Sequence, residues 1–269
     1  MNKMGQDVPK YYKILEGLRN ELNKKDSYQC FSTHLVNLNG EADSYRNIKI
    51  MFVGRTTNGW EEKEIDVAGE DLCYLTEKQM PFLKDKSYTN MSQFWNVIKK
   101  VVKEQNLSFA YSNLYRFSAK EKKLAKCRPK FLKNAEENGK NYFNTCADLL
   151  YEEIVDLGIE RCIFLTGTGK KNRDMEESIK STWIEPFKKR WEAKESNYSN
   201  KLYKHFSISK KDGTKVTKVE CLEVCHPQGK KLDPIVKQIK NFIEEKHLGG
   251  NSQGLTVTRV SSSENGSYL

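Results

Sequence analysis

Residues 48–54, Ile-Lys-Ile-Met-Phe-Val-Gly, are the stretch that decides the fold. A short apolar run that stops at a glycine is typical of a buried strand that runs into a loop. Downstream, apolar runs at 107–114, 161–166 and 215–225 have the same character. Between them the apolar residues recur at helical spacing. The expected helices cover residues 92–105, 141–157, 176–191 and, last, 232–246.

The alternation of strands and helices predicts a three-layer α/β/α fold with a mainly parallel central sheet and helices on both of its faces. We also expect a first helix over 10–24, a long loop region over 55–88 and a strand at 202–209. Pro186 lies inside the helix expected at 176–191 and should kink or break it.

The predicted domain organisation is simple. Residues 1–247 form a single α/β domain, whereas residues 248–269 are rich in Ser, Gly, Asn and Thr and are predicted to be a disordered tail. A length of 269 residues fits one large domain or two small ones.

The composition excludes several classes of protein. Apolar residues make up 37% and charged residues 30%, but 12 Phe, 13 Tyr and 4 Trp supply core material that a disordered chain lacks. No apolar run approaches the roughly 18 residues of a membrane span, and the first residues lack the apolar segment of a secretory signal. A membrane protein, a collagen-like chain and a small disulfide scaffold are therefore not expected.

The charge indicates a polyanionic partner. The net charge is +10, and the sequence pI is about 9.1, as in many nucleic-acid-binding proteins. Basic residues concentrate in 116–133 and in 201–218, where six Lys oppose one Asp. The alternative is that these segments are ordinary solvated faces.

The cysteines indicate free thiols in a reducing cytoplasm. There are seven, an odd number, and no CxxC pair completes a four-ligand zinc set with Cys221 and Cys225. We therefore expect buried small hydrophobes, no metal and no cofactor.

Polar segments follow the predicted strands. In open α/β sheets, ligands bind outside the carboxyl ends of the strands, which selects residues 54–60, 113–117, 167–171 and 226–229. The carboxamide of Asn113 suits the edge of a nucleobase, although it could instead tie down its own loop. The segment Gly167-Thr168-Gly169-Lys170 does not fit GxxxxGK[ST], which excludes a nucleoside triphosphatase of that type.

In their order, these segments resemble the uracil-DNA glycosylase superfamily over roughly residues 45–245. That family has an early strand with a glycine-led catalytic loop, a middle strand with an Asn, a later strand that ends in Gly, and a last strand with a His-Pro motif. The corresponding segments here are IMFVGRTTNGW (50–60), SNLYRF (112–117), IFLTG (163–167) and EVCHPQGK (223–230). Leu72-Cys73-Tyr74 is similar to the place where members keep an aromatic residue that stacks on the base.

The chain departs from the family at the first loop. Many members have Gly-x-Asp-Pro or Gly-x-Asn-Pro there, and a subgroup has Glu directly after the Gly. Here Arg55, Thr56 and Thr57 occupy these positions, and Asn58 comes two residues late. Asp66 or Glu62, in an acidic stretch, could reach in. The chain also lacks the four spaced cysteines of iron–sulfur members.

The resemblance implies a role for each candidate residue. Those implied to be catalytic are His226, which stabilises the charge developing on the base, and Asn58 and Thr56, which position water. The base-binding residues are Asn113, Tyr74, Gly54 and Trp60, with Phe82 as an alternative stacking residue. The DNA-binding residues are Arg55, Arg116, Ser118, Lys170, Gln228 and Lys230.

Three hypotheses remain open. The first is a monomeric DNA glycosylase that acts on flipped uracil or a related modified base. The second is a non-catalytic nucleic-acid or nucleotide binder on the same fold, supported by Thr56 in place of Asp or Asn. The third is an unrelated α/β enzyme or partner-binding protein, in which the His-Pro is only a turn.

Overall fold

The computed structural model describes only part of the chain. The described residues are 17, 28–33, 37–39, 48–55, 92–114, 116–121, 142–166, 184–199, 203–212, 215–225, 227 and 230–245. The expected helix at 10–24, apart from the helical Gly17, lies outside these residues, as do the expected tail and, apart from Arg55, the loop region at 55–88.

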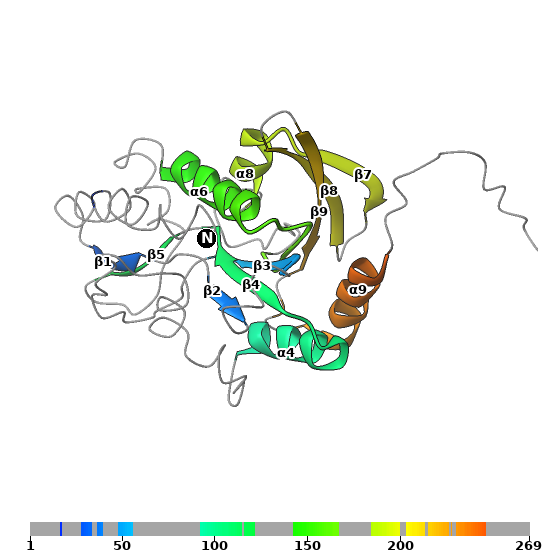
Figure 1. Cartoon of the computed structure of the whole chain (residues 1–269). Helices are drawn as coiled ribbons and strands as arrows, with labels where there is room; N and C mark the ends of the chain where they lie inside the picture. The colour runs from blue at the N-terminus through cyan, green and yellow to red at the C-terminus, as the bar shows by residue number, and fades with distance from the viewer. Residues whose placement is uncertain are drawn as a thin grey trace, which may run out of the picture.

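Thirteen strands and helices lie within the described residues (Figure 1). In chain order they are β1 (Tyr28–Thr33), β2 (Asn37–Asn39), β3 (Ile50–Gly54), α4 (Gln93–Gln105), β4 (Phe109–Asn113), β5 (Phe117–Glu121), α6 (Tyr142–Asp156), β6 (Arg161–Phe164), α8 (Glu185–Arg190), β7 (Lys194–Ser199), β8 (Tyr203–Asp212), β9 (Lys215–Val224) and α9 (Leu232–Glu244). No helix among them has both the length and the apolar character that crossing a membrane would demand.

The central element is a seven-stranded mixed sheet with the strand order β2-β4-β3-β6-β9-β8-β7. Its four central strands, β4, β3, β6 and β9, are parallel to one another. Each of the other three pairs antiparallel with its inner neighbour. The prediction of an α/β fold is confirmed, and the parallel arrangement holds for the centre of the sheet.

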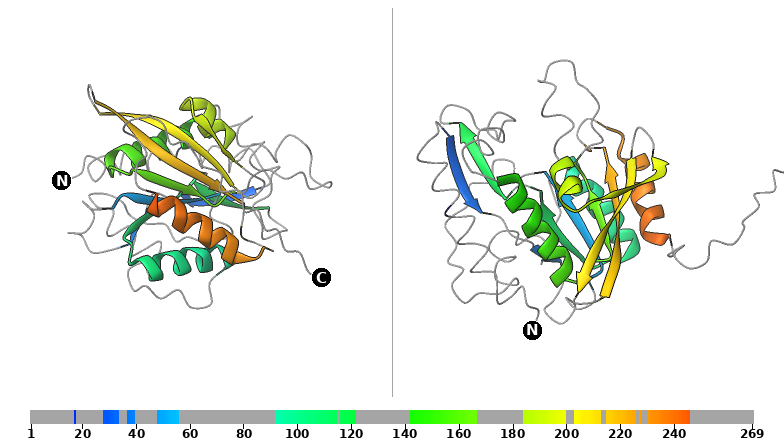
Figure 2. Two further views of the ribbon diagram at one scale, coloured as in Figure 1. Left: turned by 90° about the vertical axis from the view of Figure 1, so that its right-hand side faces the viewer. Right: turned by 90° about the horizontal axis from the view of Figure 1, so that it is seen from above.

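Helices cover both faces of the sheet. The left view of Figure 2 shows α4 and α9 together on one face and α6 and α8 on the other. Trp95, Ile98 and Val101 of α4 and Ile239 and Phe242 of α9 are buried against the first face. Each such side chain contributes about 1.5–3 kcal/mol through burial, so this apolar layer is a main source of stability.

The predicted central elements agree with the structure, but several others were missed or misplaced. Strands β1, β2, β5 and β7 were not expected, and β5 lies in the basic stretch 116–133. In the described residues α8 begins at Glu185, with Pro186 in its first turn. Proline is tolerated there because the first helical N–H groups have no intrahelical acceptor. Within the described residues, Pro186 therefore lies at the start of a helix and not inside one. Residues 176–183 lie outside the described part.

Cys146, Cys162, Cys221 and Cys225, the cysteines whose side chains are described, are all buried free thiols. Cys162 and Cys221 are register partners on β6 and β9. These four serve as small core residues, as expected.

A buried ion pair joins α6 to the end of β4. Arg116 donates from Nη1 to Oε1 of Glu153 at 2.7 Å and from Nη2 to Oε2 at 2.9 Å, and neither side chain has exposed surface. Ser112 takes part in the same network, since its Oγ accepts from Arg116 and donates to Glu153 at 2.6 Å. The network anchors the carboxyl end of β4 to the helix that covers it.

Replacement of Glu153 by Gln should destabilise the fold strongly. It leaves the Arg116 guanidinium buried without its counter-charge, and breaking such a pair costs about 3–5 kcal/mol. The free energy of unfolding, measured with urea, tests this. Asp148→Asn is the matched control because it breaks the exposed Arg190–Asp148 pair, which should matter little. Equal effects of the two substitutions would contradict the assigned role of the buried pair.

Candidate functional site at the carboxyl edge of the sheet

The topology selects one edge of the sheet. From β3 the chain leads through α4 to β4 on one side, whereas from β6 it leads toward β9 on the other side. Loops that leave adjacent parallel strands in opposite directions open a crevice between them, and ligands bind there in open α/β sheets. The carboxyl ends of β3 and β6 form this switch point.

Gly54 and Asn113 meet at this edge. They are register partners at the ends of β3 and β4. A Cβ added to Gly54 would lie 2.5 Å from Oδ1 of Asn113 and 2.9 Å from the hydroxyl of Tyr111. Real Cβ atoms do not approach other atoms so closely, so glycine is required here by close packing rather than by backbone conformation.

The Asn113 carboxamide is buried but only partly satisfied. Its Oδ1 accepts a hydrogen bond from the Tyr111 hydroxyl at 2.8 Å, and the residue has no exposed surface. Its Nδ2 has no hydrogen-bond partner in the described part of the chain. A buried unpaired donor costs about 1–3 kcal/mol, and such groups are rare enough in native folds to indicate a ligand or water site.

A second unpaired group lies just beyond β6. Thr166 is fully buried, and its Oγ1 has no hydrogen-bond partner within the described residues. Its carbonyl oxygen accepts from Nε of Arg55, which follows Gly54. Arg55 therefore spans the switch point, from the end of β3 to the end of β6.

Arg55 supplies a positive charge to this edge. Burial lowers the pKa of its guanidinium to about 10, because desolvation disfavours the charged form. The guanidinium remains protonated at neutral pH, where it can attract a phosphate or a developing anion.

The predicted site residues divide into two groups. Gly54, Arg55 and Asn113 are described and lie together at the carboxyl edge. The following candidates lie outside the described residues: Thr56, Asn58, Trp60, Glu62, Asp66, Tyr74, Phe82, Lys170, His226 and Gln228. The neighbours of His226 in the chain, Cys225 and Pro227, are buried just beyond the carboxyl end of β9.

The remaining candidates lie elsewhere or play another part. Arg116 was expected to contact DNA, but its side chain is fully buried and paired with Glu153, so it anchors the strand instead. Ser118 is in β5, which pairs with β1 in a separate two-stranded sheet. Lys230 is exposed, two residues before α9 begins.

The basic segment 201–218 extends along the whole β8–β9 hairpin, so its residues do not cluster at the candidate site. Tyr203 pairs with Val224 near the candidate site, but Asp212 pairs with Lys215 at the opposite end of β9. At about 3.3 Å per residue, the tip of this hairpin lies about 30 Å from the carboxyl edge. Among the described residues of this segment, those at the beginning of β8, around Lys204, lie nearest the carboxyl edge.

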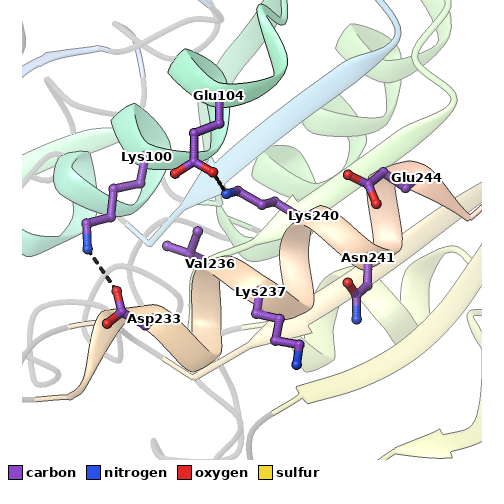
Figure 3. A pocket seen from close by; sticks show the side chains of 8 residues that line it. All are labelled: Lys100, Glu104, Asp233, Val236, Lys237, Lys240, Asn241 and Glu244. Carbon is purple, nitrogen blue, oxygen red and sulfur yellow. Dashed lines mark hydrogen bonds and ion pairs between the residues drawn. The ribbon is translucent and has the colours of Figure 1, made fainter.

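A groove of about 390 Å³ lies between α4 and α9 (Figure 3). Ion pairs cross it from Lys100 to Asp233 and from Lys240 to Glu104. Three lysines and three acidic residues line it, so their charges balance and give no preference for a polyanion. We interpret the groove as the charged seam of a packed helix pair.

Tyr111 and Thr166 were missed as site residues. Their signals in the sequence are weak: Tyr111 alternates with Asn113 on one strand, and Thr166 precedes the glycine that ends the next strand. Only the structure shows that both side chains lie beside groups already selected.

Comparison with known proteins identifies no family. A scan against protein-family models gives no match, and searches of curated proteins and of solved structures give none either. The fold and the site thus define the chain as an α/β protein. At its topological switch point, Asn113 and Thr166 each have a buried polar atom without a hydrogen-bond partner in the described residues.

Gly54→Ala should disrupt the site. The new methyl group would press on the Asn113 carboxamide and the Tyr111 hydroxyl, and overpacking of this kind costs about 1–3 kcal/mol. The free energy of unfolding measures the effect. Gly17→Ala is the matched control, because nothing lies within 4 Å of its added Cβ. If Gly54→Ala were as harmless as Gly17→Ala, the close approach of β3 to Asn113 would be refuted.

Proposed function

We propose that this chain is a DNA glycosylase of the uracil-DNA glycosylase type, which hydrolyses the N-glycosidic bond of a flipped-out uracil or related modified base. One observation carries the proposal: a buried Asn113 carboxamide lies against Gly54 at the carboxyl edge of a parallel sheet, and its Nδ2 has no hydrogen-bond partner within the described residues. A second supports it, because the four segments that resemble the family all follow the four parallel central strands.

Asn113 has the chemistry to bind the edge of a base. A planar carboxamide offers donors and an acceptor that can pair with two adjacent ring atoms. Reaching a buried group requires the base to leave the helical stack, as in enzymes that flip their target nucleotide. The proposed role of Tyr74, or of Trp60 or Phe82, is to stack on the flipped ring.

The reaction needs a water nucleophile and a stabilised leaving group. Water adds its oxygen to the sugar C1′ as the bond from C1′ to the base nitrogen breaks, and the base leaves with the electron pair. His226 is proposed to donate a hydrogen bond to the base carbonyl oxygen that gains this charge. Asn58 or Thr56 is proposed to position the water, which later loses a proton to solvent or to the base.

DNA is held by charge outside the base site. Arg55 places a guanidinium at the switch point, and Lys170, Gln228 and Lys230 follow the last two parallel strands in the sequence. Side chains of this kind bind phosphate oxygens and fix the strand beside the flipped nucleotide.

The second candidate function is binding without catalysis. Residues 55–57 are Arg-Thr-Thr, so no carboxylate is present at the positions where the family keeps its usual acid. A protein with this loop could still bind a base through Asn113. Convergence of Gly54, Asn113 and His226 on one cleft would weigh against the third hypothesis, an unrelated protein. Gly54 and Asn113 lie together, and His226 lies outside the described residues.

Base excision is the direct test. Single- and double-stranded DNA with one uracil is incubated with the protein, abasic sites are cleaved with alkali, and products are separated on a denaturing gel. The wild type should cut at the uracil, and His226→Ala and Asn113→Ala should each lose about 10²-fold or more of the rate. The exposed Asn241→Ala on α9 is the control and should cut normally. Wild-type rates in both site variants would refute the site.

Salt dependence separates binding from catalysis. We expect DNA affinity to fall steeply between low and physiological salt, with a slope of about −0.7 to −0.9 per phosphate neutralised on a log–log plot. Fluorescence anisotropy with labelled DNA measures it. Steep binding without excision would favour the second candidate function, whereas salt-independent binding would contradict a DNA partner under either one.

A further inference from the structure

We infer that the buried hydroxyl of Thr166 holds the attacking water, so that the sheet itself supplies a water-positioning group beside the loop that follows β3. This inference rests on the proposed function, because it assigns a further residue to the same hydrolysis. The family resemblance implies no role for Thr166, which precedes the glycine in IFLTG (163–167).

Thr166 lies beside the end of β3. The N–H of Leu165 donates to the Val53 carbonyl at 2.9 Å, which continues the parallel pairing of β3 and β6 by one residue. Directly afterwards, the carbonyl oxygen of Thr166 accepts a hydrogen bond from Nε of Arg55. These contacts hold Thr166 against the start of the loop that has no carboxylate at positions 55–57.

The side chain of Thr166 is a buried polar group that the described residues leave unsatisfied. It has no exposed surface, and its Oγ1 has no hydrogen-bond partner in the described part of the chain. The four residues before it, 162–165, are apolar and fully buried. A valine of the same shape would avoid the cost of burying a hydroxyl. A polar group that departs from this pattern in a native fold indicates a site for water or ligand.

A ligand at Asn113 can reach Thr166 across the end of β3. In the sheet β3 lies between β4 and β6, so at about 4.8 Å per strand spacing the ends of β4 and β6 are about 10 Å apart. Gly54, at the end of β3, has no side chain to block the passage past Asn113. This span suits a pyrimidine that contacts Asn113 through its edge and directs its glycosidic bond toward β6.

A threonine hydroxyl can orient a water molecule without acting as its base. It both accepts and donates hydrogen bonds, so Oγ1 can fix the water with its oxygen directed at the sugar C1′. That oxygen bonds to C1′ as the bond to the base nitrogen breaks, the base leaves with the electron pair, and the added water then loses a proton to solvent or to the base. A transition state with oxocarbenium character requires a well-placed water more than a strong base.

Two substitutions of Thr166 separate this role from a structural one. Thr166→Val keeps the shape but removes the hydroxyl, whereas Thr166→Ser keeps a hydroxyl. Ser207→Ala is the matched control, because it removes a buried hydroxyl from β8, where Ser207 pairs with Glu220 away from the carboxyl edge. Three quantities are measured for each protein: single-turnover release of uracil or a 5-substituted uracil from DNA, DNA affinity by fluorescence anisotropy, and the urea midpoint of unfolding.

The expected result is a loss of rate without a loss of binding or stability. Thr166→Val should release the base about 10- to 100-fold more slowly than the wild type, because its water is misplaced. It should bind DNA as tightly and unfold at the same or a higher urea concentration, since it removes a buried hydroxyl without a partner in the described residues. Thr166→Ser and Ser207→Ala should stay close to the wild-type rate.

The outcomes distinguish this inference from the proposed function. If Thr166→Val releases the base at the wild-type rate, or loses rate together with a lowered urea midpoint, Thr166 does not hold the water and the proposed function stands. The same conclusion follows if Thr166→Ser is as slow as Thr166→Val at full stability. If the wild type releases no base from any of these DNAs, the proposed function is wrong, and this inference with it.

Discussion

Backbone hydrogen bonds between β3 and β4 place Gly54 opposite Asn113, and the candidate site depends on that parallel register. Side chains alternate between the two faces of a strand, so a slip of one residue would carry Asn113 to the other face of the sheet. On its present face Asn113 lies beyond Tyr111, while Ser112, between them, lies toward α6 and bonds to Glu153. Strand β4 therefore carries the candidate binding group, Asn113, on one face and the residue that anchors the strand to α6, Ser112, on the other. The absence of a side chain at Gly54 allows the first of these arrangements.

Both faces of the sheet bury apolar side chains, but they differ in their buried charges. Under α4 and α9 the contact is apolar, and it tolerates small changes of shape that preserve volume. Under α6 and α8 two buried ion pairs, Arg116–Glu153 and Lys188–Glu223, contact the strands. Such pairs contribute little net stability because desolvation offsets their attraction, but losing one partner is costly. Their main effect is on geometry: the first fixes the end of β4, and the second fixes β9 against α8.

The sequence predicted the centre of this fold better than its edges or its site. The apolar runs of β3, β4, β6 and β9 are buried on both faces, so they are distinctive in any window of the sequence. By contrast, β2 has three residues, and β1 and β5 pair across almost ninety positions of the chain, so local patterns contain little information about them. Arg116 shows why the burial of a charged residue is hard to predict from sequence. It lies in a basic stretch and was assigned to the DNA-binding surface, but the carboxylate of Glu153, on the distant helix α6, allows it to be buried. Asn113 was found because it lies at the carboxyl end of a predicted strand, where ligands bind in such sheets, and its carboxamide suits the edge of a base. Tyr111 was not, because an aromatic residue within a strand is ordinary.

Within the part of the chain that the structure describes, Nδ2 of Asn113 has no hydrogen-bond partner, and this has a consequence for selectivity. Leaving a donor buried without a partner costs the free protein about 1–3 kcal/mol, and a ligand with an acceptor in the right place removes that cost when it binds. A ring that presents an N–H there leaves the cost in place and adds a second unpaired donor. A site that hydrogen-bonds its ligand in a dry environment rejects a mismatched analogue more strongly than a site that differs only in size. Within the proposed function, the base is bound by the sheet itself, at Gly54 and Asn113, whereas the proposed reacting groups come from the segments that follow the strands. Changes to those segments should then alter the rate of reaction, and changes to Gly54 or Asn113 should alter the binding of the base.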